Sequence, residues 1–143
     1  MRAFGIRRYK GPIERLELPR PEPGPDDLLV RVRAASVNPI DFKIQSGGVK
    51  VLTPYRMPLV LGHDLSGDVE AVGAQVTRFK PGDAVYARLD KDRIGAFAEW
   101  ALVRQNAAAR KPAGLDHRQA ASLPLVGLTA WQALVDIAGS SRA

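Results

Sequence analysis

The stretch that decides the fold is LGHDLSGDV at residues 61–69, where a short apolar run passes through Gly62 into a strand-like alternation that Gly73 ends. Glycines inside strands mark bulges and close backbone approaches, which strongly curved antiparallel sheets need at their corners. Residues 80–83 then read KPGD, a turn in which proline presets φ and glycine takes a positive φ. These signals predict two antiparallel strands, at 66–72 and 84–88, joined through a tight turn.

The same alternation of apolar and polar residues extends over the first hundred positions. Four prolines and a glycine in residues 19–27 predict a loop there. A short helix is expected at 39–45, because Asn38 suits the N-cap and Pro39 suits the first helical position. Further strands are expected at 1–9, 13–18, 28–37, 59–61, 96–103 and 107–111. Many short strands with Gly/Pro turns predict a mainly β fold, a partly closed β-barrel with short helices.

The periodicity changes after Gly114. Asp116 and Gln119 form a capping-box pattern that predicts a helix reaching about Leu123. Apolar residues at helical spacing predict a second helix over 125–138, and Gly139 lies where a C-terminal cap belongs. We therefore expect one domain over residues 1–124, followed by a helix at 125–143 that leads away from it.

Composition excludes several classes of protein. With 143 residues, 45% hydrophobic and 25% charged, the chain is an ordinary globular domain. It has no cysteine, which excludes disulfides and thiolate metal ligands. The net charge of +6 comes from scattered residues, so we expect a basic surface that attracts an anionic cofactor rather than a nucleic-acid binder. No apolar run approaches the ~20 residues of a membrane span, and no signal peptide is recognisable, so we expect a cytoplasmic location and no membrane partner.

Five motifs in order carry a family resemblance: AASVNPID at 34–41, the 61–69 segment, KPGDAV at 80–85, GAFAEW at 95–100 and LTAWQAL at 128–134. Together they resemble the GroES-like catalytic domain of the medium-chain dehydrogenase/reductase superfamily, in its zinc-free quinone oxidoreductase branch. The resemblance implies hydride transfer from NADPH to a small-molecule acceptor, namely a quinone, enone or related carbonyl compound. It also implies a Rossmann domain in the same parent protein, a parent that forms a homodimer, and no activity for this chain alone.

Metal binding separates the branches of this family. In zinc-dependent relatives, the position matching Asn38 is a cysteine that binds catalytic zinc, and His63 matches a histidine ligand. Catalytic zinc needs three protein ligands, and amides are poor ones, so we expect no zinc here. Two alternatives stay open: a fragment of a zinc-type alcohol dehydrogenase, and a non-catalytic GroES-like binding module.

The resemblance also implies roles for individual residues. Asn38, Thr129 and Lys43 would contact the cofactor, while Tyr55 and His63 would shape the acceptor side. The residues by themselves permit simpler roles: a helix cap for Asn38, a hydroxyl bonded back to its own helix for Thr129, and a solvated Lys43. His63 is the candidate general acid, or a histidine that only hydrogen-bonds nearby backbone.

Overall fold

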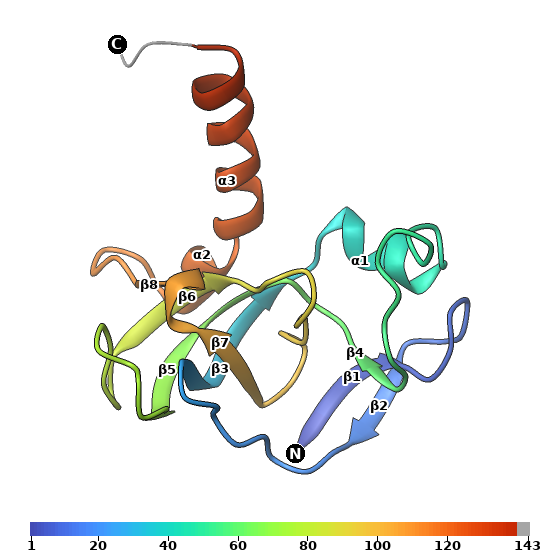
Figure 1. Cartoon of the computed structure of the whole chain (residues 1–143), viewed down its shortest axis with the longest axis horizontal. Coiled ribbons are helices and arrows are strands. Elements are labelled where there is room, and N and C mark those ends of the chain that lie inside the picture. The colour runs from blue at the N-terminus through green and yellow to red at the C-terminus, as the bar shows by residue number, and fades with distance from the viewer. Residues whose placement is uncertain (140–143) are drawn as a thin grey trace.

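The computed structural model describes residues 1–139, which form two antiparallel sheets and a projecting C-terminal helix (Figure 1). The smaller sheet has the order β2-β1-β4, with β1 (Arg2–Ile6), β2 (Glu14–Glu17) and β4 (Leu59–Val60). The larger has the order β7-β3-β5-β6-β8, with β3 (Asp27–Ser36), β5 (Asp64–Val72), β6 (Ala84–Arg88), β7 (Trp100–Arg104) and β8 (Ala108–Arg110). The predicted mainly β class is confirmed, and the sheets do not form one closed barrel.

The helices follow their sequence signals. They are α1 (Pro39–Gln45), the 3-10 turn η1 (Gln105–Ala107), α2 (His117–Ala121), α3 (Pro124–Trp131) and its π-helical continuation η2 (Gln132–Ile137). The helix predicted at 39–45 has the same bounds in the structure. The capping box of α2 is present, because the Asp116 side chain accepts the Gln119 backbone N–H and the Gln119 side-chain oxygen accepts the Asp116 backbone N–H. The last helix begins one residue earlier than predicted, because Pro124 occupies its first position instead of interrupting it.

The larger sheet holds the main core. β3 pairs with β5 on one side and β7 on the other, so Leu28, Leu29 and Val30 are all buried. Gly67 lies against β3 so closely that an added Cβ would be 2.2 Å from the carbonyl oxygen of Arg31. Irregularities of the β3–β5 register flank this region, as expected for a bulged, curved strand.

One segment links the two sheets. The Phe97 N–H donates to the Leu61 carbonyl at 2.9 Å, and the Phe97 carbonyl accepts from Phe4 at 2.7 Å. Glu99 then donates to the carbonyl of Arg2 at 3.0 Å. Residues 96–99 therefore bridge the sheets, and the predicted strand 96–103 is wrong at its start, since regular pairing with β3 begins only at Trp100.

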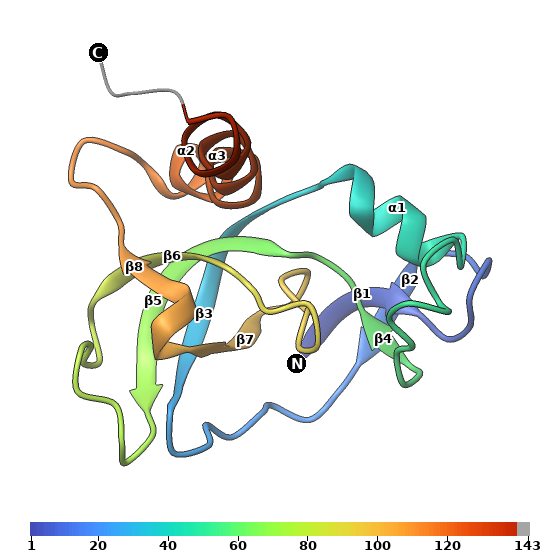
Figure 2. The same ribbon diagram turned by 45° about the horizontal axis from the view of Figure 1, so that its top comes forward.

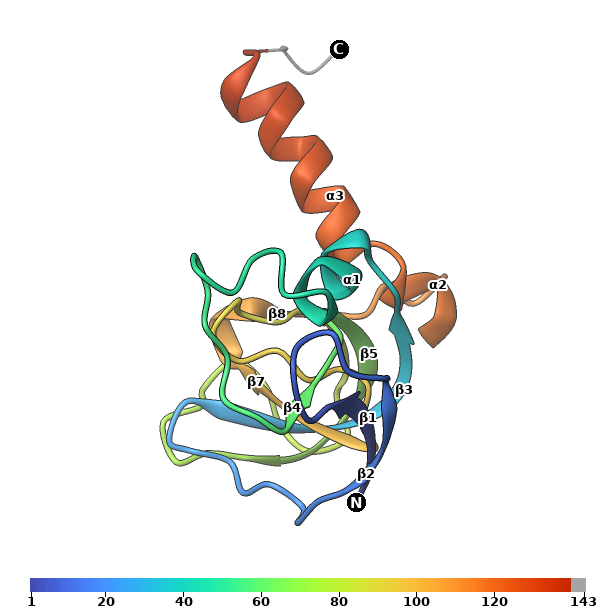
Figure 3. The same cartoon turned by 90° about the vertical axis from the view of Figure 1, so that its right-hand side faces the viewer.

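The C-terminal helix leaves much apolar surface uncovered. Figure 3 shows α3 projecting beyond the sheets, and Figure 2 looks nearly along its axis. Leu128 is 50% exposed, Leu134 59% and Ile137 83%. Gly139 has a φ of +67°, the left-handed conformation expected after a helix. Helices of globular domains normally bury such side chains, so we expect this face to be a contact surface.

We expect Gly73→Ala to destabilise the fold by about 2–3 kcal/mol, because its Cβ would be 1.9 Å from the Gly24 carbonyl oxygen. Urea unfolding followed by circular dichroism measures this effect. Gly114→Ala is the matched control, since nothing lies within 4 Å of its added Cβ. Equal stability of the two variants would contradict the close packing of the 24–25 loop on Gly73.

We also expect the isolated chain to self-associate through the exposed face of α3 and η2. Light scattering at increasing concentration should show a rising mean mass, and a Leu134→Ser, Ile137→Ser variant should remain nearer the monomer mass. Val37→Ser, at a position 63% exposed outside this helix, is the control. A wild-type chain that stays monomeric at high concentration would contradict this expectation.

Candidate functional site

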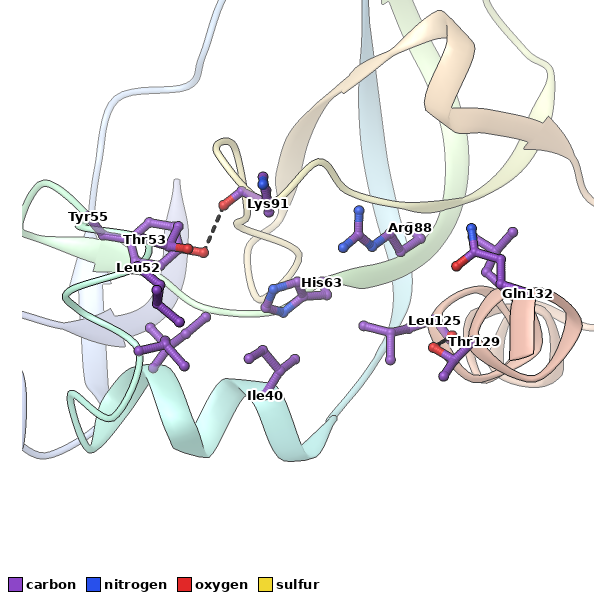
Figure 4. Close-up of a pocket in the computed structure, with 13 residues that line it drawn as sticks. Ile40, Leu52, Thr53, Tyr55, His63, Arg88, Lys91, Leu125, Thr129 and Gln132 are labelled. Atoms are coloured by element: carbon purple, nitrogen blue, oxygen red, sulfur yellow. Dashed lines mark hydrogen bonds between the residues drawn. The ribbon is translucent and has the colours of Figure 1, made fainter. Parts of the chain in front are cut away.

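A pocket of about 430 Å³ lies between α1, the loop after it, the start of β5 and the helix α3 (Figure 4). Its walls are mostly apolar, and its polar side chains come from several elements. The lining residues include His63, Arg88, Lys91, Tyr55, Thr129 and Gln132. Such a pocket, apolar with a few convergent polar groups, is typical of a small-molecule site.

His63 is held in the pocket wall by Asp41. The Nδ1 atom of His63 is 2.8 Å from Oδ1 of Asp41, and both residues are 2% exposed. The other oxygen of Asp41 accepts the backbone N–H of Asn38 at 2.8 Å, at the start of α1. With Asp41 ionised, Nδ1 carries the proton and Nε2 is the nitrogen left to accept a hydrogen bond.

The next residue, Asp64, is fully buried and bonds in a different direction. Its Oδ2 accepts hydrogen bonds from Asn38 Nδ2 at 3.1 Å, Ser36 Oγ at 3.2 Å and the Leu125 backbone at 3.2 Å. Its Oδ1 is buried without a hydrogen-bond partner among the described residues. Burial raises the pKa of Asp64 above its usual value, and the hydrogen bond from Asn38 opposes that rise.

Two residues predicted to bind the cofactor lie outside the lining of this pocket. Asn38 is 4% exposed and its side-chain amide donates to Asp64 and to Ser36. Lys43 is exposed on α1. The structure therefore brings His63, Tyr55 and Thr129 together around one cavity and leaves these two apart.

Thr129 and Tyr55 face the pocket from opposite sides. The Thr129 hydroxyl donates to the Leu125 carbonyl at 2.7 Å, which leaves its oxygen able to accept a bond. The Tyr55 hydroxyl donates to the Lys91 carbonyl at 2.7 Å, so the loop after α1 is tied to the loop after β6. Burial raises the pKa of Tyr55.

Three residues of the site were not predicted from the sequence. Arg88 ends β6 and Lys91 follows it in the charged 90–93 segment, and both residues line the pocket. Nothing in their spacing distinguishes them from surface cations. The bond between Asp41 and the start of α1 could have been predicted, because an acid three residues after an N-cap residue accepts the backbone N–H of that residue.

His117 takes part in a separate cluster. Its Nδ1 is 2.8 Å from Ser66 Oγ, and its Nε2 is 3.5 Å from Asp68. The chain of contacts from Ser66 through His117 to Asp68 resembles a hydrolytic triad. However, Ser66 is 0% exposed and its hydroxyl donates to the Val85 carbonyl at 2.8 Å. A serine that no substrate can reach is not a nucleophile, so the cluster fastens α2 to β5.

Across residues 1–139, no group of three or more His, Asp or Glu side chains is arranged to hold a metal ion. No helix in that part of the chain is long and apolar enough to cross a membrane.

We expect Asp64→Asn to change the pH dependence of stability. Because the folded state raises the pKa of Asp64, it binds that proton more tightly than the unfolded chain does. The wild type therefore loses stability as the pH rises from 3.8 through the higher folded pKa, and the Asn variant does not. The free energy of unfolding of Asp64→Asn, relative to wild type, should increase across that window.

Asp27→Asn is the control of opposite sign. A bidentate contact with Arg93 lowers the pKa of Asp27, so the wild type gains stability as the pH rises towards 3.8. The free energy of unfolding of Asp27→Asn, relative to wild type, should therefore decrease as the pH rises through that lower window. Urea unfolding at a series of pH values measures the free energy of unfolding of both variants. If this free energy has the same pH dependence in Asp64→Asn and in wild type, the burial of an ionisable Asp64 is contradicted.

Comparisons with known proteins identify the family of this chain. The chain is 40% identical over 126 residues to the chloroplastic quinone-oxidoreductase homolog of Spinacia oleracea, covering 88% of this chain and 38% of that protein. An alcohol dehydrogenase superfamily protein from Novosphingobium aromaticivorans superposes with a TM-score of 0.91 at 39% identity, covering 100% of this chain and 44% of that one. A mycobacterial protein in complex with NADPH gives a TM-score of 0.88 at 32% identity, with 100% and 43% covered.

This chain thus spans between 38% and 44% of the length of these relatives. The alcohol dehydrogenase GroES-like domain family matches residues 24–113, more than half of the chain. The resemblance predicted from the motifs is confirmed at this level, while the zinc-free branch stays a prediction. The chain belongs to the alcohol dehydrogenase GroES-like domain family.

Proposed function

We propose that this chain forms the substrate side of an NADPH-dependent oxidoreductase that reduces a quinone, enone or related carbonyl compound. The observation that carries the proposal is the pocket in which His63, Tyr55 and Thr129 meet. The name of the spinach relative and the NADPH complex of the mycobacterial protein support the acceptor and the cofactor.

The lining of the pocket fits the nicotinamide end of the cofactor and a flat acceptor. Apolar side chains such as Ile40 and Leu125 give dry walls for the rings, and Thr129 offers a hydroxyl oxygen to the carboxamide N–H. Arg88 and Lys91 line the same pocket, and their positive charge would attract an anionic cofactor. NADPH supplies the hydride when bound, and these residues orient it and exclude water.

His63 and Tyr55 lie on the acceptor side in this proposal. Asp41 keeps the His63 ring in one orientation, and in the protonated imidazolium Nε2 would carry a proton that it could donate to the carbonyl oxygen of the acceptor. Most of the cofactor would bind a nucleotide-binding domain elsewhere in the parent protein. The cofactor roles of Asn38 and Lys43, the absence of zinc, the homodimer and the cytoplasmic location stay predictions.

The direct test begins with the parent coding sequence after Ala143, where a strand, a glycine-rich turn and a helix are expected. The parent protein should oxidise NADPH in the presence of a quinone, and the 143-residue chain alone should not. Bound zinc in the purified parent would contradict the zinc-free assignment. A parent without nicotinamide-dependent activity on quinones, enones or carbonyls would contradict the function itself.

Thr129→Val in the parent protein tests the cofactor contact. We expect kcat/KM to fall about 3- to 10-fold, the effect of losing one neutral hydrogen bond. Thr77→Val is the control, because Thr77 is exposed and lies outside the pocket lining. Unchanged kinetics for Thr129→Val would remove Thr129 from the cofactor site.

A further inference from the structure

One end of the molecule is built from two segments that lie side by side, the turn 7–12 between β1 and β2 and the loop 46–58 after α1 (Figures 1 and 3). The Lys10 backbone donates to the Gln45 carbonyl at 2.6 Å. The Tyr9 hydroxyl accepts the Tyr55 N–H at 2.9 Å. These bonds hold the turn and the loop as one surface, which we call the basic tip.

Two consecutive apolar side chains stand out from this surface. Val51 is 87% exposed and Leu52 is 85% exposed, the highest values among the large apolar residues described. Val49 and Tyr55, on either side of them, pack against the smaller core cluster around Ile44. The loop is therefore anchored at both ends, and its apex presents apolar side chains to the solvent.

The basic tip carries positive charge without acids. Residues 7–12 and 42–62 contain no Asp or Glu. The exposed cations without an ion pair in residues 1–139 include Arg8, Lys10, Lys50 and Arg56. Asp90 and Asp92, in the loop that Tyr55 contacts, are both bound by Arg104, so they do not offset this charge.

We propose that the basic tip docks onto an anionic lipid surface, with Val51 and Leu52 inserted among the headgroups and the surrounding cations on the phosphates. An apolar apex ringed by lysine and arginine is the pattern that partitions into a charged membrane interface. A protein partner would need a preformed hole to receive two protruding side chains, whereas a lipid interface deforms around them. This inference goes beyond the proposed function and does not depend on it.

Docking through this tip would bring the pocket to the lipid surface, since Leu52 also lines the pocket. The sequence predicted no membrane partner, because none of its apolar runs is long enough to span a bilayer. A loop apex of two apolar residues has no such signature, and only the folded arrangement places the cations of the 7–12 turn beside it.

Sedimentation with sucrose-loaded vesicles tests the proposal on the 143-residue chain. We expect binding to phosphatidylcholine vesicles that contain about one-third phosphatidylserine, weak binding to pure phosphatidylcholine, and weaker binding at high salt. A Lys10→Gln, Lys50→Gln, Arg56→Gln variant should lower the partition coefficient about 100-fold. A Val51→Ser, Leu52→Ser variant should lower it about tenfold.

Two control variants test whether vesicle binding comes from the basic tip, rather than from the overall positive charge or from the exposed C-terminal helix. A Lys80→Gln, Arg118→Gln variant removes exposed cations outside the tip, and Ile137→Ser removes an apolar side chain that is 83% exposed on η2. Both should bind the vesicles like wild type, and all variants should keep the wild-type circular dichroism and thermal transition.

Three results would overturn the proposal. One is no preference for the anionic vesicles over neutral ones. Another is wild-type binding by the Val51→Ser, Leu52→Ser variant, which would reduce the effect to attraction between opposite charges. The third is equally tight binding of an acidic peptide such as polyglutamate, lost in the same variants, which would make the tip a protein-binding surface.

Discussion

The buried carboxylate of Asp64 is the constraint on which the site depends. Pro124 has no N–H, so the first free amide of α3 belongs to Leu125, and it bonds to Asp64. The same oxygen accepts from Ser36 at the end of β3 and from Asn38 at the start of α1. One oxygen atom therefore joins a strand, a helix cap and the projecting helix, and three hydrogen bonds offset part of the cost of burying the charge.

Neighbouring residues divide two tasks at this point of the chain. His63 contributes to the pocket wall, while Asp64 turns inward to hold α3 and thereby the positions of Leu125 and Thr129. The first turn of α1 supports both tasks. Asp41 fixes the His63 ring, and Asn38 bonds Asp64. A change at this turn would therefore disturb the wall and the helix together.

Local signals predicted α1, the α2 capping box and the turn at 80–83, because each depends on residues within a few positions. Contacts between distant segments were not predictable in the same way. Residues 96–99 alternate like a strand, but their partner Phe4 lies in β1 of the other sheet and their partner Leu61 directly follows β4. Asn38 reads as a helix cap or a ligand contact, yet its amide bonds Asp64, 26 residues further along the chain. The pocket residues Arg88 and Lys91 become recognisable only once α3 stands opposite them.

The molecule leaves apolar side chains exposed on two surfaces whose surroundings differ. The helix over residues 124–137 contains no lysine or arginine, and its exposed residues repeat along several turns beside the pocket wall. An extended apolar face without cations suits a packed protein contact, as between two halves of an enzyme. The basic tip offers only Val51 and Leu52, far less than the roughly 800 Å² per partner of a stable protein interface. Its cations supply the remaining attraction only where the opposing surface carries dense negative charge, as an anionic lipid surface does.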